Sequence, residues 1–371
     1  RQNFSQVTNP PIDSLRENKV MSLKTRFGNL GNILDFDTLT KENIYVLNSP
    51  ILSNSQFNKF INFFGKNSIN LDCTFLQNEN LTNAITRIQK EAEIAVRQGV
   101  KQLVLSDKDL SSEKLPIPML LCVGAINTFL IEKKLRGYVS INVQSGEALD
   151  THSFATLIGV GATTVNPYLA FDSLYQRYSK KLFGQFSFDE CVQRYIKSVN
   201  AGLLKIMSKM GISVLSSYRG GCNFETVGLS RTVVNDYFPG VTSKISGIGL
   251  TGIEKKIREI HKEAFESTET VLPIGGIYRY RKNGETHQYQ GNLIHLLQSA
   301  VSSNSYDAYK KYAEGIYNLP PINLRDLVNF RKKKLGPSIE LSEVEPLENI
   351  LKRFGSGSMS HGALSKEAHE T

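Results

Sequence analysis

Short apolar runs rich in β-branched residues alternate with longer segments of helical periodicity along most of the chain. Residues 80–98 repeat apolar side chains at helical spacing, and Gly99 follows as a common helix stop. The next run, QLVLSDKD at 102–109, is typical of a buried strand that ends in a polar loop. A helix is predicted over 117–137, and a second strand begins at Tyr138. Strand–helix–strand units of this length predict an α/β fold with a mainly parallel sheet covered by helices.

The same alternation continues with a predicted helix at 200–211 and a predicted strand in ISVLSSYRGG at 212–221. Ligands of open parallel sheets gather at the carboxyl ends of the strands. The loops SDKD, SGEALDTHSF and SYRGGCNFE follow the predicted strands, so we expect functional side chains there.

The pattern changes near residue 265, where alternating aromatic and basic residues precede a long helical stretch at about 293–317. A chain of 371 residues with 40% hydrophobic residues can form two cores. We therefore predict a first domain over 1–265 and a second domain over 266–371. The chain begins at Arg1 in mid-pattern, and we expect that it has been cut from a longer protein.

Composition argues against several classes of protein. The formal net charge of +9 suggests a nucleic-acid partner, but the basic residues are spread along the chain without aromatic interleaving, so no nucleic acid is expected. No run of eighteen apolar residues occurs, and no membrane span is expected. The four cysteines lie far apart without a CxxC motif, which predicts buried free thiols in a reducing compartment and no zinc ribbon.

The closing segment GSGSMSHGALS is the most site-like stretch, yet it fits neither common phosphate-binding pattern. Ser360 stands where a dinucleotide fingerprint needs its last glycine, and Ala363 stands where a P-loop needs lysine. Small residues at a strand end let a planar ligand approach backbone N–H groups. The alternative is an ordinary strand–turn–helix packed closely through glycine.

Three further pairs of residues have a chemical and a structural interpretation. Cys222 near Arg219 could be a thiol of lowered pKa, but a loop in which Arg219 pairs a carboxylate is favoured. Asp150 or Thr151 is predicted to cap a helix, which leaves the neighbouring His152 as a weaker catalytic or metal candidate. Glu285 and the histidine two residues later would share one face of a strand, but two ligands do not make a metal site.

Several long motifs, in order, closely resemble the large chain of glutamate synthase, most like the ferredoxin-dependent type. The resemblance spans essentially the whole chain and is far more specific than any single glycine pattern. It rests on QVTNPPIDSLRENKVMSLKTRFGNLGNIL, LVLSDK, DTHSFATLIGVGATTVNPYL, GLLKIMSKMGISVLSSYRGG, FETVGL, SGIGL, YRYRKNGETHQYQ and GSMSHGALSKEAHET.

The resemblance implies that 1–265 is the central α/β domain of such an enzyme. It implies that 266–371 is the truncated beginning of an FMN-binding (β/α)8 barrel, with GSMSHGALS as its first strand and loop. By position, Met359, Ser360, Gly362 and Ala363 match the family segment that lines the flavin and 2-oxoglutarate site. The glutaminase cysteine and the cluster-binding cysteines of the family would lie outside this segment.

The reaction implied by the resemblance makes two L-glutamate from L-glutamine and 2-oxoglutarate. Ammonia from glutamine would pass through an internal tunnel and form 2-iminoglutarate, which reduced FMN would convert to glutamate by hydride transfer. Electrons would come from reduced ferredoxin through a 3Fe-4S iron–sulfur cluster, and FAD is a further possible cofactor of the full-length enzyme. The expected location is the plastid (chloroplast) stroma, or alternatively the cytoplasm of a cyanobacterium.

Three alternatives stay open. The chain could belong to an NADPH-type glutamate synthase, since the distinction from the ferredoxin type depends on a few residues in HGALSKEAHE. It could belong to another FMN-dependent (β/α)8 oxidoreductase. It could be a non-catalytic scaffold or a nucleic-acid binder, which would need a clustered basic face.

Overall fold

The computed structural model divides the chain into two compact units, Arg1–Thr268 and Glu269–Thr371, and each is described by itself. The residues that the structure describes are 14–28, 34, 44–268, 280–281, 284–288, 290–329 and 336–354.

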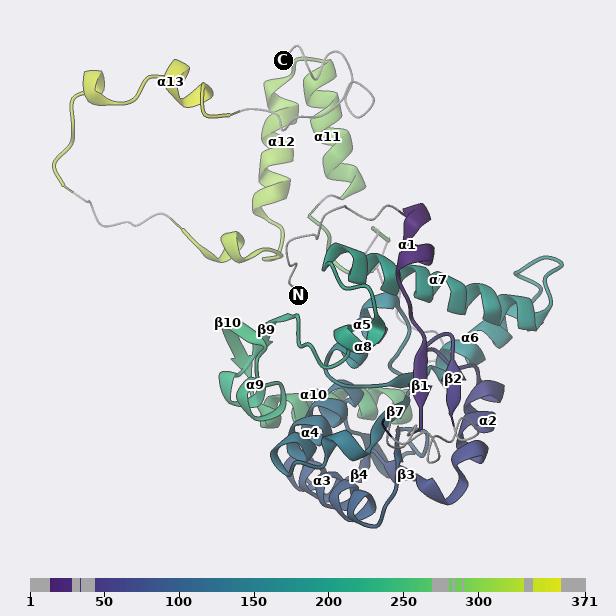
Figure 1. Cartoon of the computed structure of the whole chain (residues 1–371). Helices are drawn as coiled ribbons and strands as arrows, with labels where there is room; N and C mark the ends of the chain where they lie inside the picture. Colours follow the sequence, from purple (N-terminus) through teal and green to yellow (C-terminus); the bar gives the residue numbers. More distant parts are fainter. Residues whose placement is uncertain are drawn as a thin grey trace. The chain divides into compact units, whose positions relative to one another are not determined.

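A four-stranded parallel sheet forms the centre of the first unit (Figure 1). Its strands lie in the order β3 (Ser68–Asp72), β5 (Gln102–Ser106), β7 (Ser140–Gln144) and β8 (Thr164–Asn166). Every residue of β5 is buried, as expected for an inner strand with both faces covered. The predicted parallel-sheet α/β fold of the central domain is therefore confirmed, as are the predicted strands at β5 and β7.

Helices connect these strands and cover the sheet. The predicted stripe at 80–98 forms α3 (Leu81–Arg97), which begins where the Asn80 side chain accepts a hydrogen bond from the Asn83 N–H at 2.8 Å. Between β5 and β7 lies α4 (Met119–Glu132), which is buried on almost every side. The predicted cap at Asp150 starts α5 (Thr151–Gly159) between β7 and β8. The other described helices of this unit, apart from one single-turn helix, are α1 (Ser14–Val20), α2 (Asn54–Phe64), α6 (Tyr168–Ser179), α7 (Phe188–Lys209), α9 (Arg231–Tyr237) and α10 (Leu250–Glu266).

Three small strand pairs surround the main sheet. Strands β1 (Thr25–Phe27) and β2 (Tyr45–Leu47) pair antiparallel and pack aromatic rings against α2. Strands β4 (Thr74–Leu76) and β6 (Lys114–Pro116) also pair antiparallel. Strands β9 (Glu225–Leu229) and β10 (Thr242–Ile248) pair in parallel.

Segments from the beginning of the first unit pair with segments that come much later in the chain. The Ser22 N–H donates to the Ser213 carbonyl at 2.8 Å, and the Leu215 N–H donates to the Ser22 carbonyl at 3.0 Å. In the same way, the Leu52 N–H donates to the Val165 carbonyl at 3.0 Å. Residue Ile51 thereby forms a parallel bridge with β8, at the edge of the main sheet.

The predicted strand at 212–221 is wrong. The segment forms one bridging residue, Val214, and then the single-turn helix α8 (Leu215–Tyr218). Leu215 and Tyr218 are three residues apart and both are buried, which suits a helical turn. The Tyr218 hydroxyl donates to the Ala155 carbonyl on α5 at 3.0 Å, so tertiary contacts select this turn.

The described part of the second unit is mainly helical. Helices α11 (Gly291–Ser302) and α12 (Tyr306–Tyr317) pack against each other in place of one long helix at 293–317. The break lies at Asn304, which has a φ of +48°, and Ser305 caps α12. A short helix α13 (Leu347–Leu351) follows. Among the helices described in both units, none has the length and apolar character to cross a membrane.

Candidate functional site

The carboxyl ends of the parallel strands bring together two of the three loops expected to carry function. Asp107 directly follows β5, and Ser145 and Gly146 directly follow β7. The Ser145 hydroxyl donates to Asp107 Oδ2 at 2.5 Å, and the Gly146 N–H donates to Asp107 Oδ1 at 3.1 Å. Adjacent parallel strands end at one edge of a sheet, which is why these two loops meet.

Asp107 is the buried centre of this loop cluster. Only 4% of the residue is exposed, and burial raises the pKa of its carboxyl group. Hydrogen bonds from Ser145, Gly146 and the Tyr168 hydroxyl favour the charged form and oppose that rise. Burial and the neighbouring Asp107 charge also raise the pKa of Tyr168. Asp107 is therefore positioned with its oxygens occupied, as expected of a residue that fixes the loops.

Glu147 is the second carboxylate of the cluster and stands at its surface. Its Oε2 atom accepts a hydrogen bond of 2.9 Å from the N–H of Met119, the first residue of α4. Atoms packed around the carboxyl group raise its pKa to about 7, and the Asp107 charge adds to this shift. A carboxyl group with this pKa can exchange a proton near neutral pH. Sequence reasoning placed the loop here but did not single out Glu147.

A chain of side-chain hydrogen bonds crosses the strands behind this cluster. The Ser106 hydroxyl donates to Gln144 Oε1 at 3.0 Å, and Gln144 Nε2 donates to Asn166 Oδ1 at 3.1 Å. Asn166 Nδ2 in turn donates to Asn54 Oδ1 at 2.9 Å. These pairings satisfy polar groups at the ends of three strands and keep the carboxyl edge in register.

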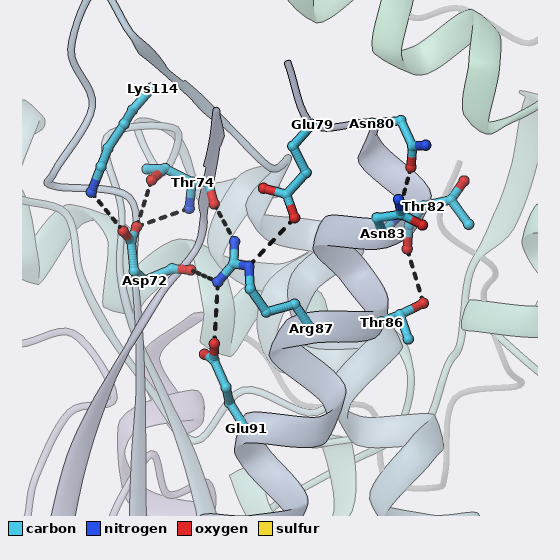
Figure 2. A network of polar contacts seen from close by, with 10 residues as sticks. All are labelled: Asp72, Thr74, Glu79, Asn80, Thr82, Asn83, Thr86, Arg87, Glu91 and Lys114. Carbon is cyan, nitrogen blue, oxygen red and sulfur yellow. Dashed lines mark hydrogen bonds and ion pairs between the residues drawn. The ribbon is translucent and has the colours of Figure 1, made fainter. Parts of the chain in front are cut away.

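A separate charged network holds the end of β3 against α3 (Figure 2). Arg87 Nη2 donates to the Thr74 carbonyl at 2.6 Å, and the same guanidinium group contacts Glu79 and Glu91. The Asp72 carboxylate accepts hydrogen bonds from Thr74 and from Lys114 Nζ, the latter at 2.9 Å. Burial opposes ionisation of Asp72, but these hydrogen bonds outweigh it and lower its pKa. The network is a structural clamp, because each charge in it has a partner.

The third loop, SYRGGCNFE, lies away from this edge. The Gly220 N–H donates to the Ile158 carbonyl at 3.1 Å, and the Cys222 N–H donates to the Gly159 carbonyl at 3.0 Å, at the far end of α5. Burial raises the pKa of Cys222, so the hypothesis of a lowered thiol pKa is wrong. The favoured alternative is correct in that these residues form a loop, but Arg219 forms no ion pair with a carboxylate among the described residues.

The other candidate residues remain apart. Asp150 accepts from the Ser153 N–H at 2.9 Å, and the exposed His152 lies at the edge of a cavity of about 200 Å³. Glu285 and His287 lie in an irregular segment and not on a strand. Within the described ranges, no group of three or more metal-ligating side chains is present. Cys73, Cys122 and Cys191 are buried free thiols, as expected.

The residues predicted to contact FMN, Met359, Ser360, Gly362 and Ala363, lie outside the described residues, as does the expected first barrel strand. Their assignment stays a prediction.

Two protein families match the chain. The glutamate synthase central domain matches residues 1–230, and a conserved region of glutamate synthase matches residues 287–371. A solved structure, the flavin-binding domain of baker's yeast flavocytochrome b2, aligns with 42% of this chain and 38% of its own at 17% identity. The TM-score of 0.28 is too low for this alignment to show a shared fold.

Curated relatives match over the whole length of the chain. The NADPH glutamate synthase large chain of Azospirillum brasilense is 50% identical, over 100% of this chain and 24% of that protein. The corresponding Bacillus subtilis chain is 41% identical, over 100% of this chain and 24% of that protein. The ferredoxin-dependent glutamate synthase of Pyropia yezoensis is 41% identical over 100% and 25%. The chain thus spans about a quarter of these relatives, and its matched residues show that it belongs to the glutamate synthase family.

Proposed function

We propose that this chain is part of a glutamate synthase that makes two L-glutamate from L-glutamine and 2-oxoglutarate. The observation that carries the proposal is the family match over 1–230 and 287–371, supported by 50% identity to one large chain. The first unit would act as scaffold and ammonia conduit and not as the reaction centre. Its carboxyl-edge carboxylate, Asp107, has its oxygens engaged by neighbouring loops, which suits a supporting role.

FMN is the cofactor proposed for the second unit. When bound, it would supply hydride chemistry for the reduction step. Met359, Ser360, Gly362 and Ala363 would hold it, because small residues let backbone N–H groups approach a planar ring. An iron–sulfur cluster would be held by residues outside this segment.

Reduced ferredoxin is the proposed electron donor, on the likeness of HGALSKEAHE to ferredoxin-type chains. The second candidate donor is NADPH. It is favoured by sequence identity, which is 50% to the NADPH-type Azospirillum chain and 41% to the ferredoxin-dependent Pyropia enzyme. A ferredoxin-dependent enzyme would be located in the plastid stroma or in the cytoplasm of a cyanobacterium.

The test is an assay of the full-length protein with glutamine and 2-oxoglutarate. Glutamate formation with reduced ferredoxin would support the proposal in full, and formation with NADPH alone would support the second candidate. No glutamate with either donor, from protein that contains flavin, would refute the proposed reaction.

A matched pair of variants tests the flavin contacts. Gly362→Val is expected to lower the flavin content of the purified protein, because a branched side chain would block close approach to the ring. Gly336→Val is the control, since no atom lies within 4 Å of a Cβ at that position. Equal flavin content in both variants would contradict the assignment of Gly362.

A further inference from the structure

Two arginines converge at the amino end of the main sheet, opposite the Asp107 cluster. Arg136 belongs to the 3₁₀ turn at Arg136–Tyr138, just before β7. Its guanidinium group donates to Asn127 Oδ1 at 2.7 Å, to the Val139 carbonyl at 2.6 Å and to the Gly161 carbonyl at 2.9 Å. All three acceptors are neutral, so they orient the group without balancing its charge.

Arg219 lies close enough to Arg136 for the two charges to repel each other. Burial, and then this repulsion, lower the pKa of Arg136 to about 10, while burial lowers the pKa of Arg219. The backbone explains the proximity. The N–H groups of Gly220 and Cys222, which closely follow Arg219, donate to the carbonyls of Ile158 and Gly159, three and two residues before the Gly161 carbonyl that Arg136 binds.

The Arg219 guanidinium group itself has no hydrogen-bond acceptor and no carboxylate partner among the described residues. The nearby end of α5 does not supply the missing acceptor. Its carbonyls at Ile158 and Gly159 already accept from the backbone N–H groups of Gly161, Gly220 and Cys222. The helix dipole offsets only part of the charge there. A partly buried arginine beside a second arginine, with the Ile158, Gly159 and Gly161 carbonyls already accepting hydrogen bonds, leaves a local excess of positive charge.

The guanidinium fork is the side chain best suited to bind a carboxylate or a phosphate through two parallel hydrogen bonds. The three acceptors fix the position of the Arg136 guanidinium group and its charge near Arg219. Arg219 is partly exposed, which allows an anion to reach it.

We propose that Arg219, supported by the nearby charge of Arg136, binds an oxyanion at the amino end of the sheet. The oxyanion is a carboxylate or phosphate group, supplied by a small anion in solution or by an acidic side chain from elsewhere in the full-length protein. The proposal does not depend on the glutamate synthase reaction, since it concerns the face away from the carboxyl edge.

The direction in which one substitution shifts the thermal midpoint tests the proposal. In the full-length protein, Arg219→Met keeps the apolar stem and removes the charge. If the group is unpaired, this change relieves repulsion and raises the thermal midpoint; if an oxyanion is bound, it lowers the midpoint by about 2–4 °C. Arg97→Met is the control; it removes an exposed arginine of α3 that pairs with Glu93, and it should shift the midpoint little.

Measurements with and without inorganic phosphate, at matched ionic strength, distinguish the two sources. A small anion predicts that phosphate stabilises the wild type and Arg97→Met but not Arg219→Met. An internal carboxylate predicts that Arg219→Met is less stable in both buffers and that phosphate has no effect. Arg219→Lys, which keeps the charge without the fork, should lose most of the effect in either case. An Arg219→Met protein that is as stable as the wild type, or more stable, in both buffers would overturn the proposal.

Discussion

Arg87 should contribute far more to stability than Arg97, although both are arginines of α3 that pair with a glutamate one turn away. The perturbation is Arg87→Met, with Arg97→Met as the matched control. Methionine keeps helix propensity and most of the apolar stem, so the comparison isolates the guanidinium group.

The structure sets the expected magnitude. Arg87 Nη2 holds the carbonyl of the buried Thr74 at 2.6 Å, a charged hydrogen bond of about 1.5–3 kcal/mol. Its contacts with the carboxylates of Glu79 and Glu91 are partly exposed and add about 0–1 kcal/mol each. Arg87→Met should therefore lower the free energy of unfolding by about 1.5–5 kcal/mol. Among the described residues the exposed Arg97 side chain bonds Glu93 alone, and its loss should cost about 0.3–0.5 kcal/mol.

The assay is urea denaturation followed by far-UV circular dichroism, because the chain contains no tryptophan. Arg87→Lys adds a second check. A point charge cannot hold the Thr74 carbonyl and two carboxylates together, so lysine should restore only part of the loss. Equal destabilisation by Arg87→Met and Arg97→Met would refute the reasoning, as would full recovery with lysine.

Three further outcomes are expected. Gly159→Ala should lower stability by about 1–3 kcal/mol, because its Cβ would lie 2.1 Å from the Phe224 ring. Combining it with Phe224→Leu should reduce that penalty. Gly137→Ala, at a position where a Cβ meets no atom within 4 Å, should show no penalty in the same urea titration. Atoms packed around its carboxyl group raise the pKa of Glu147 from 4.5 to about 7, so the folded protein binds the proton more tightly and stability falls as pH rises through this interval. Glu147→Gln should weaken this dependence of stability on pH, measured as urea midpoints across the interval. An unchanged dependence would show that other groups cause it. Cys222 should be the cysteine that a thiol reagent modifies in the folded protein, slowly at neutral pH and faster as pH rises. Mass spectrometry locates the adduct, and modification of a buried cysteine first would contradict the burial pattern.

The parts of the fold that local patterns encode could be predicted from the sequence. Helix α3 carries a full apolar stripe and an asparagine cap, and β5 is a short buried run between turn signals. The segment at 212–221 has neither signal. Its apolar residues suit a strand or a turn of helix equally, and contacts with Ser22 and Ala155 decide the outcome.

The site shows the same division. The meeting of the SDKD and SGEALD loops follows from parallel strands, so Asp107 and Ser145 could be expected at one edge. The raised pKa of Glu147 depends on packing around α4, which no local pattern encodes. Likewise, Arg136 and Arg219 approach each other only because a glycine-rich turn folds back onto α5.

The pairing of early segments with late ones has a consequence for how the first unit is made. During synthesis, Ser22 leaves the ribosome long before residues 213–215, and Ile51 long before β8. Both early segments must stay unpaired until their partners arrive, because the contacts close long loops of chain. Helix α3 and strands β3 and β5 can assemble during that interval. The early segments are then captured in two successive steps, first Ile51 by β8 and later Ser22 by residues 213–215.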